Sequence, residues 1–227
     1  SIHGRAIPAP MAERAAPIPQ PKKGEVLVRT HAAGINPVDW KIRKLGPPLG
    51  PDMPAVLQGD VAGVVETVGA DVSGFAVGEE VYGCAGGVKG TGGALAEFMA
   101  CDADFLAPKP TNLSMVEAAA LPLVCLTAWE GLVDGANVGW GQTVLVHAGA
   151  GGVGHIAIQI AIARGAKVYT TVSGPEKAAV VSEFGAIPIN YRENSVEDYV
   201  ATHTGGAGFD IVYDTVGGEN IPKSWTA

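Results

Sequence analysis

Apolar and polar positions are arranged differently in the two parts of the chain. Up to about residue 112, short apolar runs are broken by Gly and Pro, which is typical of short strands. From Ser114 onward, short apolar runs alternate with longer segments that carry helix signals. The sequence therefore predicts an irregular, mostly β domain over 1–112, followed by a domain over 113–227 in which helices cover a parallel sheet.

Local signals predict the individual elements. In the first domain, strands are expected at 25–31, 63–68, 80–83 and 94–99. Ser114 and Glu117 form a capping box that starts a helix, Pro122 breaks it, and a second helix is expected over about 127–134. In the second domain, strands are expected at 143–147, 167–172, 187–190 and 210–213. Helices are expected between them over 153–164, over 175–184 and after Ser195.

A glycine-rich turn follows the strand at 143–147. Gly149, Gly151 and Gly154 fit the pattern G-x-G-x-x-G, with a helix and a second strand after them. Without a Cβ at the turn, the pyrophosphate of a dinucleotide can reach backbone N–H groups at the start of the helix. The strand–turn–helix context favours dinucleotide binding, and the alternative is a glycine-rich turn that binds nothing.

The residues after the second strand of this domain indicate which dinucleotide the domain would bind. NAD-binding folds place an Asp or Glu there for the ribose 2′-hydroxyl, and 171–174 (TVSG) contains no acid. Ser173, Lys177, Tyr191 and Arg192 instead offer hydroxyls and positive charge, which suit a 2′-phosphate. We therefore expect NADPH rather than NADH. The alternative is that Ser173 and Lys177 are a helix cap and its solvated first turn.

The net charge and the cysteine content indicate which binding partners and which cellular location to expect. With a formal net charge of −8, the chain lacks the basic surface that nucleic acids and anionic membranes require. The most apolar stretch, 118–129, is too short to span a bilayer. The three cysteines are widely spaced, which fits neither a disulfide framework nor a C-x-x-C metal site. We expect no nucleic-acid or membrane partner and a reducing, cytoplasmic location.

The second domain has fewer strands than its fold requires. A doubly wound dinucleotide-binding sheet has the strand order 3-2-1-4-5-6, and this sequence supplies strands one to four. The fourth strand would be an open edge, which natural proteins normally cover or pair. We therefore expect the domain to be truncated after strand four and the chain to be part of a longer protein.

Several motifs together resemble one family. They are 34–40 (GINPVDW), 59–69 (GDVAGVVETVG), 93–98 (GALAEF), 118–123 (AAALPL), 126–129 (LTAW) and the glycine turn. In this order they resemble the medium-chain dehydrogenase/reductases, in particular the zinc-free, ζ-crystallin-like quinone oxidoreductases. The resemblance implies an α/β protein with a GroES-like catalytic domain, a Rossmann domain and an active site in the cleft between them. It also implies a homodimer for the full-length protein, because the family's last strands usually form the dimer contact.

The resemblance assigns roles to residues that match the family's motifs. Asn36 would lie beside the nicotinamide and the substrate, where its amide could hold an acceptor carbonyl. Thr127 would contact the nicotinamide end of the cofactor. The residues that match the pyrophosphate turn are Gly149, Gly151, Gly152, Val153 and Gly154. The residues that match the 2′-phosphate site are Ser173, Lys177 and Tyr191.

The positions that hold catalytic zinc in zinc-dependent relatives match Asn36, Gly59 and Leu123 here. Gly59 and Leu123 have no side-chain donor and Asn36 is a poor zinc ligand, so no metal is expected. Alcohol oxidation needs a strong polariser of the alkoxide. The resemblance therefore implies hydride transfer from NADPH to a small quinone or α,β-unsaturated carbonyl.

One departure from the family and two alternatives stay open. Quinone reductases of this branch often carry tyrosine just after the Asn-Pro motif, where Trp40 and Lys41 stand here. Lys41 could stabilise negative charge developing on a carbonyl oxygen, or it could be a solvated surface lysine. The chain could also be a non-catalytic NADPH-binding protein with a structural or regulatory role. It has no Tyr-x-x-x-Lys pair, which excludes a short-chain dehydrogenase.

Overall fold

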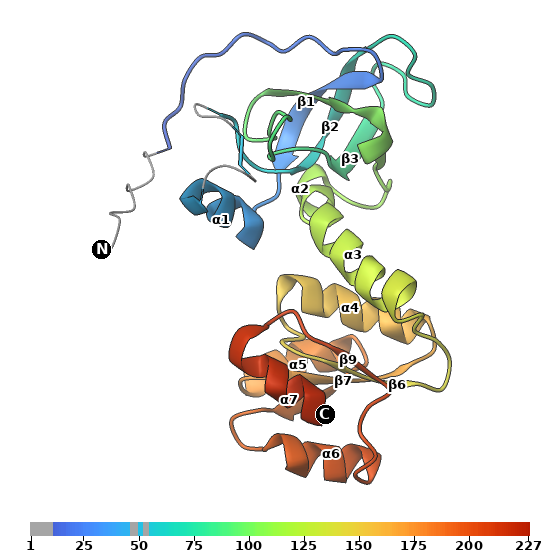
Figure 1. Ribbon diagram of the computed structural model, residues 1–227. Helices are drawn as coiled ribbons and strands as arrows, with labels where there is room; N and C mark the ends of the chain where they lie inside the picture. The colour runs from blue at the N-terminus through green and yellow to red at the C-terminus, as the bar shows by residue number, and fades with distance from the viewer. Residues whose placement is uncertain (1–10, 46–49, 52–54) are drawn as a thin grey trace, which may run out of the picture. The chain divides into compact units, whose positions relative to one another are not determined.

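The chain forms two compact units, Ser1–Leu123 and Val124–Ala227. The computed structural model describes residues 11–45, 50–51 and 55–227 (Figure 1). The division falls later than the sequence-based boundary at residue 112. The reason is packing, since buried Ala118 and Ala119 contact Ala62 in the first sheet. The helix that contains them therefore belongs with the preceding strands.

Unit 1 is built on a five-stranded antiparallel sheet with the order β4-β1-β2-β3-β5. Its strands are β1 (Glu25–Ala33), β2 (Asp60–Val68), β3 (Glu80–Cys84), β4 (Phe98–Asp102) and β5 (Ala107–Pro108). Alternate residues such as Val26, Val28 and Val81 are fully buried and form the core with Met99. This is the mostly β first domain that the sequence predicts.

The strand expected at 94–99 is displaced along the chain. The amides of Ala94 and Leu95 donate to the carbonyls of Gln58 and Leu57, outside the sheet ladder. Pairing with β1 begins only at Phe98, so β4 starts there. The expected range was therefore wrong, because a bond to a distant segment takes the backbone groups that a strand would use.

In the described part of unit 1, three α-helices lie wholly or partly within the unit. They are α1 (Pro37–Leu45), α2 (Met115–Ala119) and α3 (Pro122–Trp129), which continues as a π-helical segment, Glu130–Gly135. The capping box of Ser114 and Glu117 is confirmed. The break near Pro122 is also confirmed, since Pro122 begins α3. The sequence did not predict α1.

Unit 2 contains a four-stranded parallel sheet with the order β8-β7-β6-β9. Its strands are β6 (Thr143–Val146), β7 (Lys167–Val172), β8 (Ile187–Asn190) and β9 (Ile211–Tyr213). In chain order this is 3-2-1-4, which is the start of the doubly wound order that the sequence predicts. The fold class is therefore confirmed.

Helices cover both faces of this parallel sheet. They are α4 (Gly152–Ala163), α5 (Pro175–Glu183), α6 (Val196–Thr204) and α7 (Ile221–Thr226). Residues of α4 and α5 pack with Val144 and Val146 of β6, whereas residues of α6 pack with Leu145, whose side chain points to the other face. In Figure 1, α4 and α6 accordingly lie on opposite sides of the sheet. Among the described residues, no helix has the length and apolar character needed to cross a bilayer.

The loop after β9 is organised by one carboxylate. Asp214 accepts hydrogen bonds from the amides of Val216 and Gly217 and from the side chains of Asn220 and Ser224. Partial burial raises the pKa of Asp214, but these four hydrogen bonds outweigh burial and lower it to about 2. The ionised carboxylate therefore stabilises the connection from β9 to α7.

We expect Asp214→Asn to lower the free energy of unfolding by at most roughly 2 kcal/mol at neutral pH, less any solvent screening. Since the folded pKa of about 2 lies below the ordinary value of 3.8, the stabilisation is complete above 3.8 and is lost as pH falls through about 2. Denaturant unfolding of both proteins from pH 7 downward measures this. A stability gap that does not change with pH would contradict it.

Candidate dinucleotide and acceptor site

Two glycines of the turn after β6 are required by packing. Gly149 is buried, and a Cβ there would overlap the Thr170 hydroxyl and lie 2.8 Å from Cδ1 of Ile158. Gly154 is buried too, and a Cβ there would overlap the carbonyl oxygen of Ala148 and lie 2.7 Å from Cα of Gly149. These contacts bring the first turn of α4 close to the ends of β6 and β7.

Gly151 and Gly152 differ from these two, because the protein itself leaves space beside them. Both are exposed, and a Cβ on Gly152 would meet nothing closer than Cγ1 of Val124 at 3.5 Å. Gly151 is the N-cap of α4 and no side chain caps the helix. The first amides of α4 therefore face open surface next to residues without side chains, which is the arrangement that binds a phosphate.

Unit 2 places this turn at the point where its strand order reverses. β6 lies between β7 and β9, and the amide of His147 donates to the carbonyl of Tyr213 at 2.9 Å. The phenol of Tyr213 in turn donates to the carbonyl of Thr127 at 2.9 Å. Thr127 is thus held at the carboxyl end of the sheet, where ligands of doubly wound folds bind.

His147 and Tyr213 make contacts that link distant segments of unit 2. The imidazole of His147 is buried, its Nδ1 lies 3.3 Å from the Thr171 hydroxyl, and its Nε2 has no partner among the described residues. Burial lowers the pKa of His147. Tyr213 packs on Gly131, where a Cβ would overlap its ring. These contacts join distant segments, so no sequence pattern could signal them.

The residues expected at a 2′-phosphate gather at the ends of β7 and β8. Val172 and Asn190 are partners in the parallel ladder, and the amide of Tyr191 donates to the carbonyl of Val172 at 3.2 Å. Ser173 and Tyr191 are therefore neighbours along this edge. Lys177 lies in the first turn of α5, is exposed, and has no hydrogen bond or ion pair to any described residue.

In unit 1, Asn36 is held by two carboxylates. Its backbone amide donates to Oδ2 of Asp39 at 2.7 Å, and its side-chain Nδ2 donates to Oδ2 of Asp60 at 2.8 Å. Asn36 is 7% exposed and Asp60 is fully buried. The Asp39 bond also closes the first turn of α1, which starts at Pro37.

Asp60 is the centre of this cluster. Its two carboxylate oxygens also lie 3.1 and 3.3 Å from the amide nitrogen of Leu123, and the thiol of Cys84 hydrogen-bonds to it. Burial raises the pKa of Asp60, while the donors from Asn36, Leu123 and Cys84 oppose that rise. Burial raises the pKa of Cys84 to about 12. The cluster therefore consists of hydrogen-bond donors directed at one carboxylate.

The three positions that we expect to match the zinc ligands of zinc-dependent relatives lie at this cluster. Asn36 and Leu123 both donate to Asp60, and Gly59 precedes it in the chain. A Cβ on Gly59 would lie 2.7 Å from the carbonyl oxygen of Gly86, so a side chain there would require the backbone to move. Within the described part of the chain, no group of three or more His, Cys, Asp or Glu could hold a metal ion.

Gln58, just before Gly59, was not singled out by the sequence. It adopts a left-handed φ of 73°, is 7% exposed, and its Oε1 has no hydrogen-bond partner among the described residues. A left-handed backbone at a residue with a long side chain is strained, and such strain is concentrated at functional sites. The backbone just before β2 is therefore held in this conformation by contacts with neighbouring segments, because Gln58 on its own does not favour a left-handed φ.

Lys41 lies on the solvent side of α1. Its Nζ is 5.9 Å from the centroid of the exposed Trp40 ring, as is Nζ of Lys44. Ile42, the next residue, points inward and is buried. Lys41 is thus available to a ligand and has a cation–π contact with Trp40.

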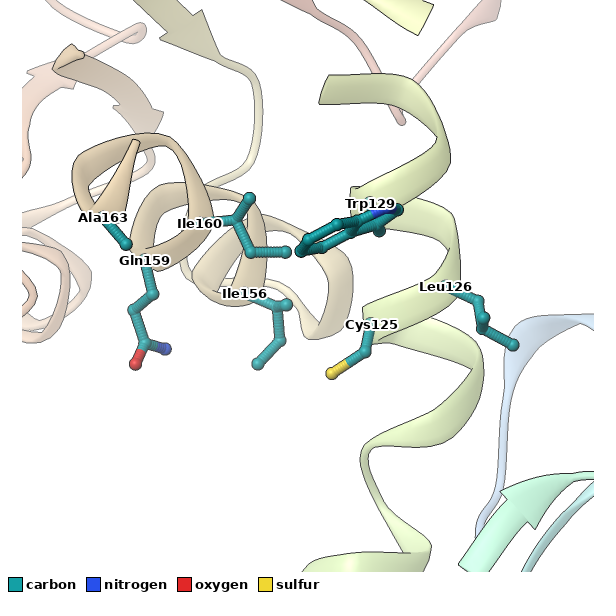
Figure 2. A pocket seen from close by; sticks show the side chains of 7 residues that line it. All are labelled: Cys125, Leu126, Trp129, Ile156, Gln159, Ile160 and Ala163. Atoms are coloured by element: carbon teal, nitrogen blue, oxygen red, sulfur yellow. The ribbon is translucent and has the colours of Figure 1, made fainter. Parts of the chain in front are cut away.

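An apolar pocket lies elsewhere in unit 2, along α3 and α4 (Figure 2). Its volume is about 510 Å³. It is lined by Cys125, Leu126, Trp129, Ile156, Gln159, Ile160 and Ala163. Its lining is mostly apolar, with side-chain polar atoms on Cys125, Trp129 and Gln159, and it includes no carboxylate, imidazole or ammonium group.

Two family models match the chain. One, described as alcohol dehydrogenase GroES-like domain, matches residues 22–111, and the other, described as zinc-binding dehydrogenase, matches residues 152–227. The 2-methylene-furan-3-one reductase of Solanum lycopersicum is 42% identical over 216 residues, which is 91% of this chain and 53% of that protein.

Solved structures match both units together. An alcohol dehydrogenase superfamily protein from Novosphingobium aromaticivorans has a TM-score of 0.92 at 50% identity, covering 96% of this chain and 66% of that one. The Escherichia coli quinone oxidoreductase complexed with NADPH has a TM-score of 0.83 at 34% identity, covering 95% of this chain and 64% of that one. This chain thus spans about half of the tomato protein and about two thirds of these solved chains.

The different surroundings of the glycines lead to a paired prediction. We expect Gly154→Ala to lower the free energy of unfolding by roughly 1–3 kcal/mol, because the new methyl group overlaps the Ala148 carbonyl. We expect Gly152→Ala to retain stability, since Ala favours helices and has room there, but to weaken NADPH binding. Denaturant unfolding and fluorescence titration with NADPH measure the two effects. Unchanged NADPH affinity in Gly152→Ala would mean that this turn is not the phosphate site.

Proposed function

Because the chain belongs to the medium-chain dehydrogenase/reductase superfamily, on its quinone oxidoreductase branch, we propose that it is a zinc-independent oxidoreductase. It transfers hydride from NADPH to a small quinone or α,β-unsaturated carbonyl. The observation that carries this proposal is the uncapped start of α4, where Gly151 and Gly152 leave open surface at the amides.

The proposed cofactor contacts follow from that surface. The amides of Gly152, Val153 and Gly154 bind the pyrophosphate, with Gly149 and Gly151 shaping the turn. Thr127, anchored through Tyr213, contacts the nicotinamide end. The chemistry supplied by bound NADPH is hydride donation, and the protein supplies orientation.

NADPH is preferred over NADH because of the side chains at the ends of β7 and β8. Ser173 and Tyr191 are brought together by the ladder, and the exposed Lys177 is free to pair with a 2′-phosphate. No carboxylate occurs in 171–174 to repel a phosphate or to bind a 2′-hydroxyl. The NADPH complex of the Escherichia coli relative supports the same choice.

Zinc does not fit the matched positions. Zinc requires lone pairs from Cys, His or carboxylate side chains. Here Leu123 contributes an N–H donor, Gly59 has no room for a side chain, and the Asn36 amide is bonded to Asp60. No step of the proposed reaction uses a metal, and the acceptor must already be electrophilic.

Unit 1 is proposed to act on the acceptor. Asn36 has one further N–H and a carbonyl oxygen that could orient an acceptor carbonyl and the nicotinamide amide. Lys41 is the second catalytic candidate, because its ammonium could stabilise negative charge developing on the acceptor oxygen. The full-length protein is proposed to be a cytoplasmic homodimer, and the small number and wide spacing of the cysteines, Cys84, Cys101 and Cys125, support the reducing compartment.

We expect the purified full-length protein to oxidise NADPH when a quinone or an enone is added, and EDTA to leave the rate unchanged because no metal takes part. Nicotinamide absorbance follows the reaction. Tight NADPH binding without oxidation by either acceptor would favour the non-catalytic alternative. Activity that is lost with EDTA and restored by zinc would contradict zinc independence.

We expect Ser173→Ala and Lys177→Ala each to raise the Michaelis constant for NADPH about tenfold, because each removes a hydrogen bond to a charged phosphate. The Michaelis constant for NADH should change little. Steady-state kinetics with both cofactors measures this, with Lys89→Ala, an exposed lysine in unit 1, as control. Equal effects on both cofactors would show that these residues do not bind the 2′-phosphate.

A further inference from the structure

We propose that Asp60 is a positioning residue, whose buried carboxylate fixes the Asn36 amide in the orientation that presents its second N–H and its oxygen to the ligand. This inference rests on the proposed role of Asn36 at the acceptor. Asp60 itself touches neither substrate nor cofactor.

The orientation of the Asn36 amide follows from what Asp60 can do. Oδ2 of Asp60, which Nδ2 of Asn36 approaches, also lies 3.3 Å from the backbone nitrogen of Leu123 and accepts its N–H. Leu123 offers only a backbone N–H, so it must donate to Asp60, and the thiol of Cys84 donates as well. Nδ2 of Asn36, at 2.8 Å, must therefore face the carboxylate, and the flipped amide would set oxygen against oxygen.

The backbone of Asn36 is fixed as well. Its amide N–H donates to Asp39, and its carbonyl accepts from the amide of Asp39 at 3.0 Å. With the backbone and one side-chain N–H both bonded, the side-chain oxygen of Asn36 has no partner among the described residues. That oxygen and the second Nδ2 hydrogen are left for an exogenous group. Such restraint is what orientation in catalysis requires.

Burying the Asp60 carboxylate costs free energy, so its buried position depends on the particular donors that surround it. A fully buried carboxylate is expensive unless hydrogen bonds satisfy it. Here the donors come from three segments that are distant in sequence, namely Asn36, Cys84 at the end of β3 and Leu123 next to the start of α3, and they meet Asp60 at the start of β2. The carboxylate joins the segments that carry the positions matching zinc ligands, and it does so with donors instead of a metal.

The decisive experiment is a double-mutant cycle of Asp60→Asn and Asn36→Ala. Asp60→Asn keeps the shape but places an N–H where an acceptor is needed. We expect each single variant to lower kcat/KM for the acceptor roughly ten- to hundredfold, and the double variant to be no worse than Asn36→Ala. The dissociation constant of NADPH, set mainly by the unit 2 turn, should change less than about threefold. The matched control is Asp102→Asn. In the wild-type protein the Asp102 carboxylate also accepts a hydrogen bond from a backbone amide of unit 1, that of Asp104.

Nuclear magnetic resonance supplies a readout that needs no turnover. In the cofactor-free wild-type protein, one side-chain N–H of Asn36 should exchange slowly with solvent and the other rapidly. Asp60→Asn should remove this difference, and Asn36→Ala assigns the signals. Because the wild-type measurement alone tests the bond, it remains informative if Asp60→Asn fails to fold.

The possible outcomes separate the two proposals. Equal exchange of the two N–H protons in wild type, normal kinetics in Asp60→Asn, or losses that multiply in the double variant would each overturn the positioning role. Normal acceptor kinetics in Asn36→Ala would instead remove Asn36 from the proposed function. Wild-type protein that never oxidises NADPH would contradict the function while leaving the exchange measurement to decide the orientation of the amide.

Discussion

The close approach of α4 to the ends of β6 and β7 is the constraint on which unit 2 depends. Gly149 and Gly154 permit it, because side chains at either position would overlap Thr170 or the Ala148 backbone. The approach leaves the first amides of α4 uncapped beside Gly151 and Gly152. The same packing that forms the core thus creates a surface with a positive potential at the carboxyl edge of the sheet. Stability and the proposed binding of an anion therefore depend on the same turn, although Gly149 and Gly154 serve packing whereas Gly151 and Gly152 leave the open surface.

Unit 1 depends on a different interaction, the burial of Asp60 among donors. Asn36, Gly59 and Leu123, which we expect to match the zinc ligands of zinc-dependent relatives, lie here at a carboxylate surrounded by an amide, a backbone N–H and a thiol. A zinc ion, or a carboxylate with its donors, can join such segments, but only a metal can polarise an alcohol. A site that orients without polarising suits acceptors that are already reactive, which agrees with the proposed quinone or enone substrates.

Elements defined by neighbouring residues could be predicted, and those defined by distant bonds could not. β7 and β8 have the predicted bounds, because each is a short segment rich in β-branched or aromatic residues that ends at a local turn signal, Ser173-Gly174 after β7 and Tyr191-Arg192 after β8. The expected strand at 94–99 was wrong because Ala94 and Leu95 bond to Leu57 and Gln58. α1 was missed because it is short and mostly exposed, and its start depends on the Asp39–Asn36 bond. The candidate site follows the same division, since the glycine motif is local whereas the roles of His147, Tyr213 and Asp60 depend on segments far away in sequence.

The amino-acid sequence by itself determined the fold class, the strand order of unit 2 and the position of the glycine turn between β6 and α4, since periodicity, capping residues and glycine spacing act over a few residues. Only the tertiary structure decided which glycines serve packing and which leave open surface, that Thr127 is held at the end of β9, and that the Asn36 amide is bonded to Asp60. The physical reason is that these contacts join residues separated by tens of positions, and no local pattern specifies which donor will meet which acceptor when the chain folds.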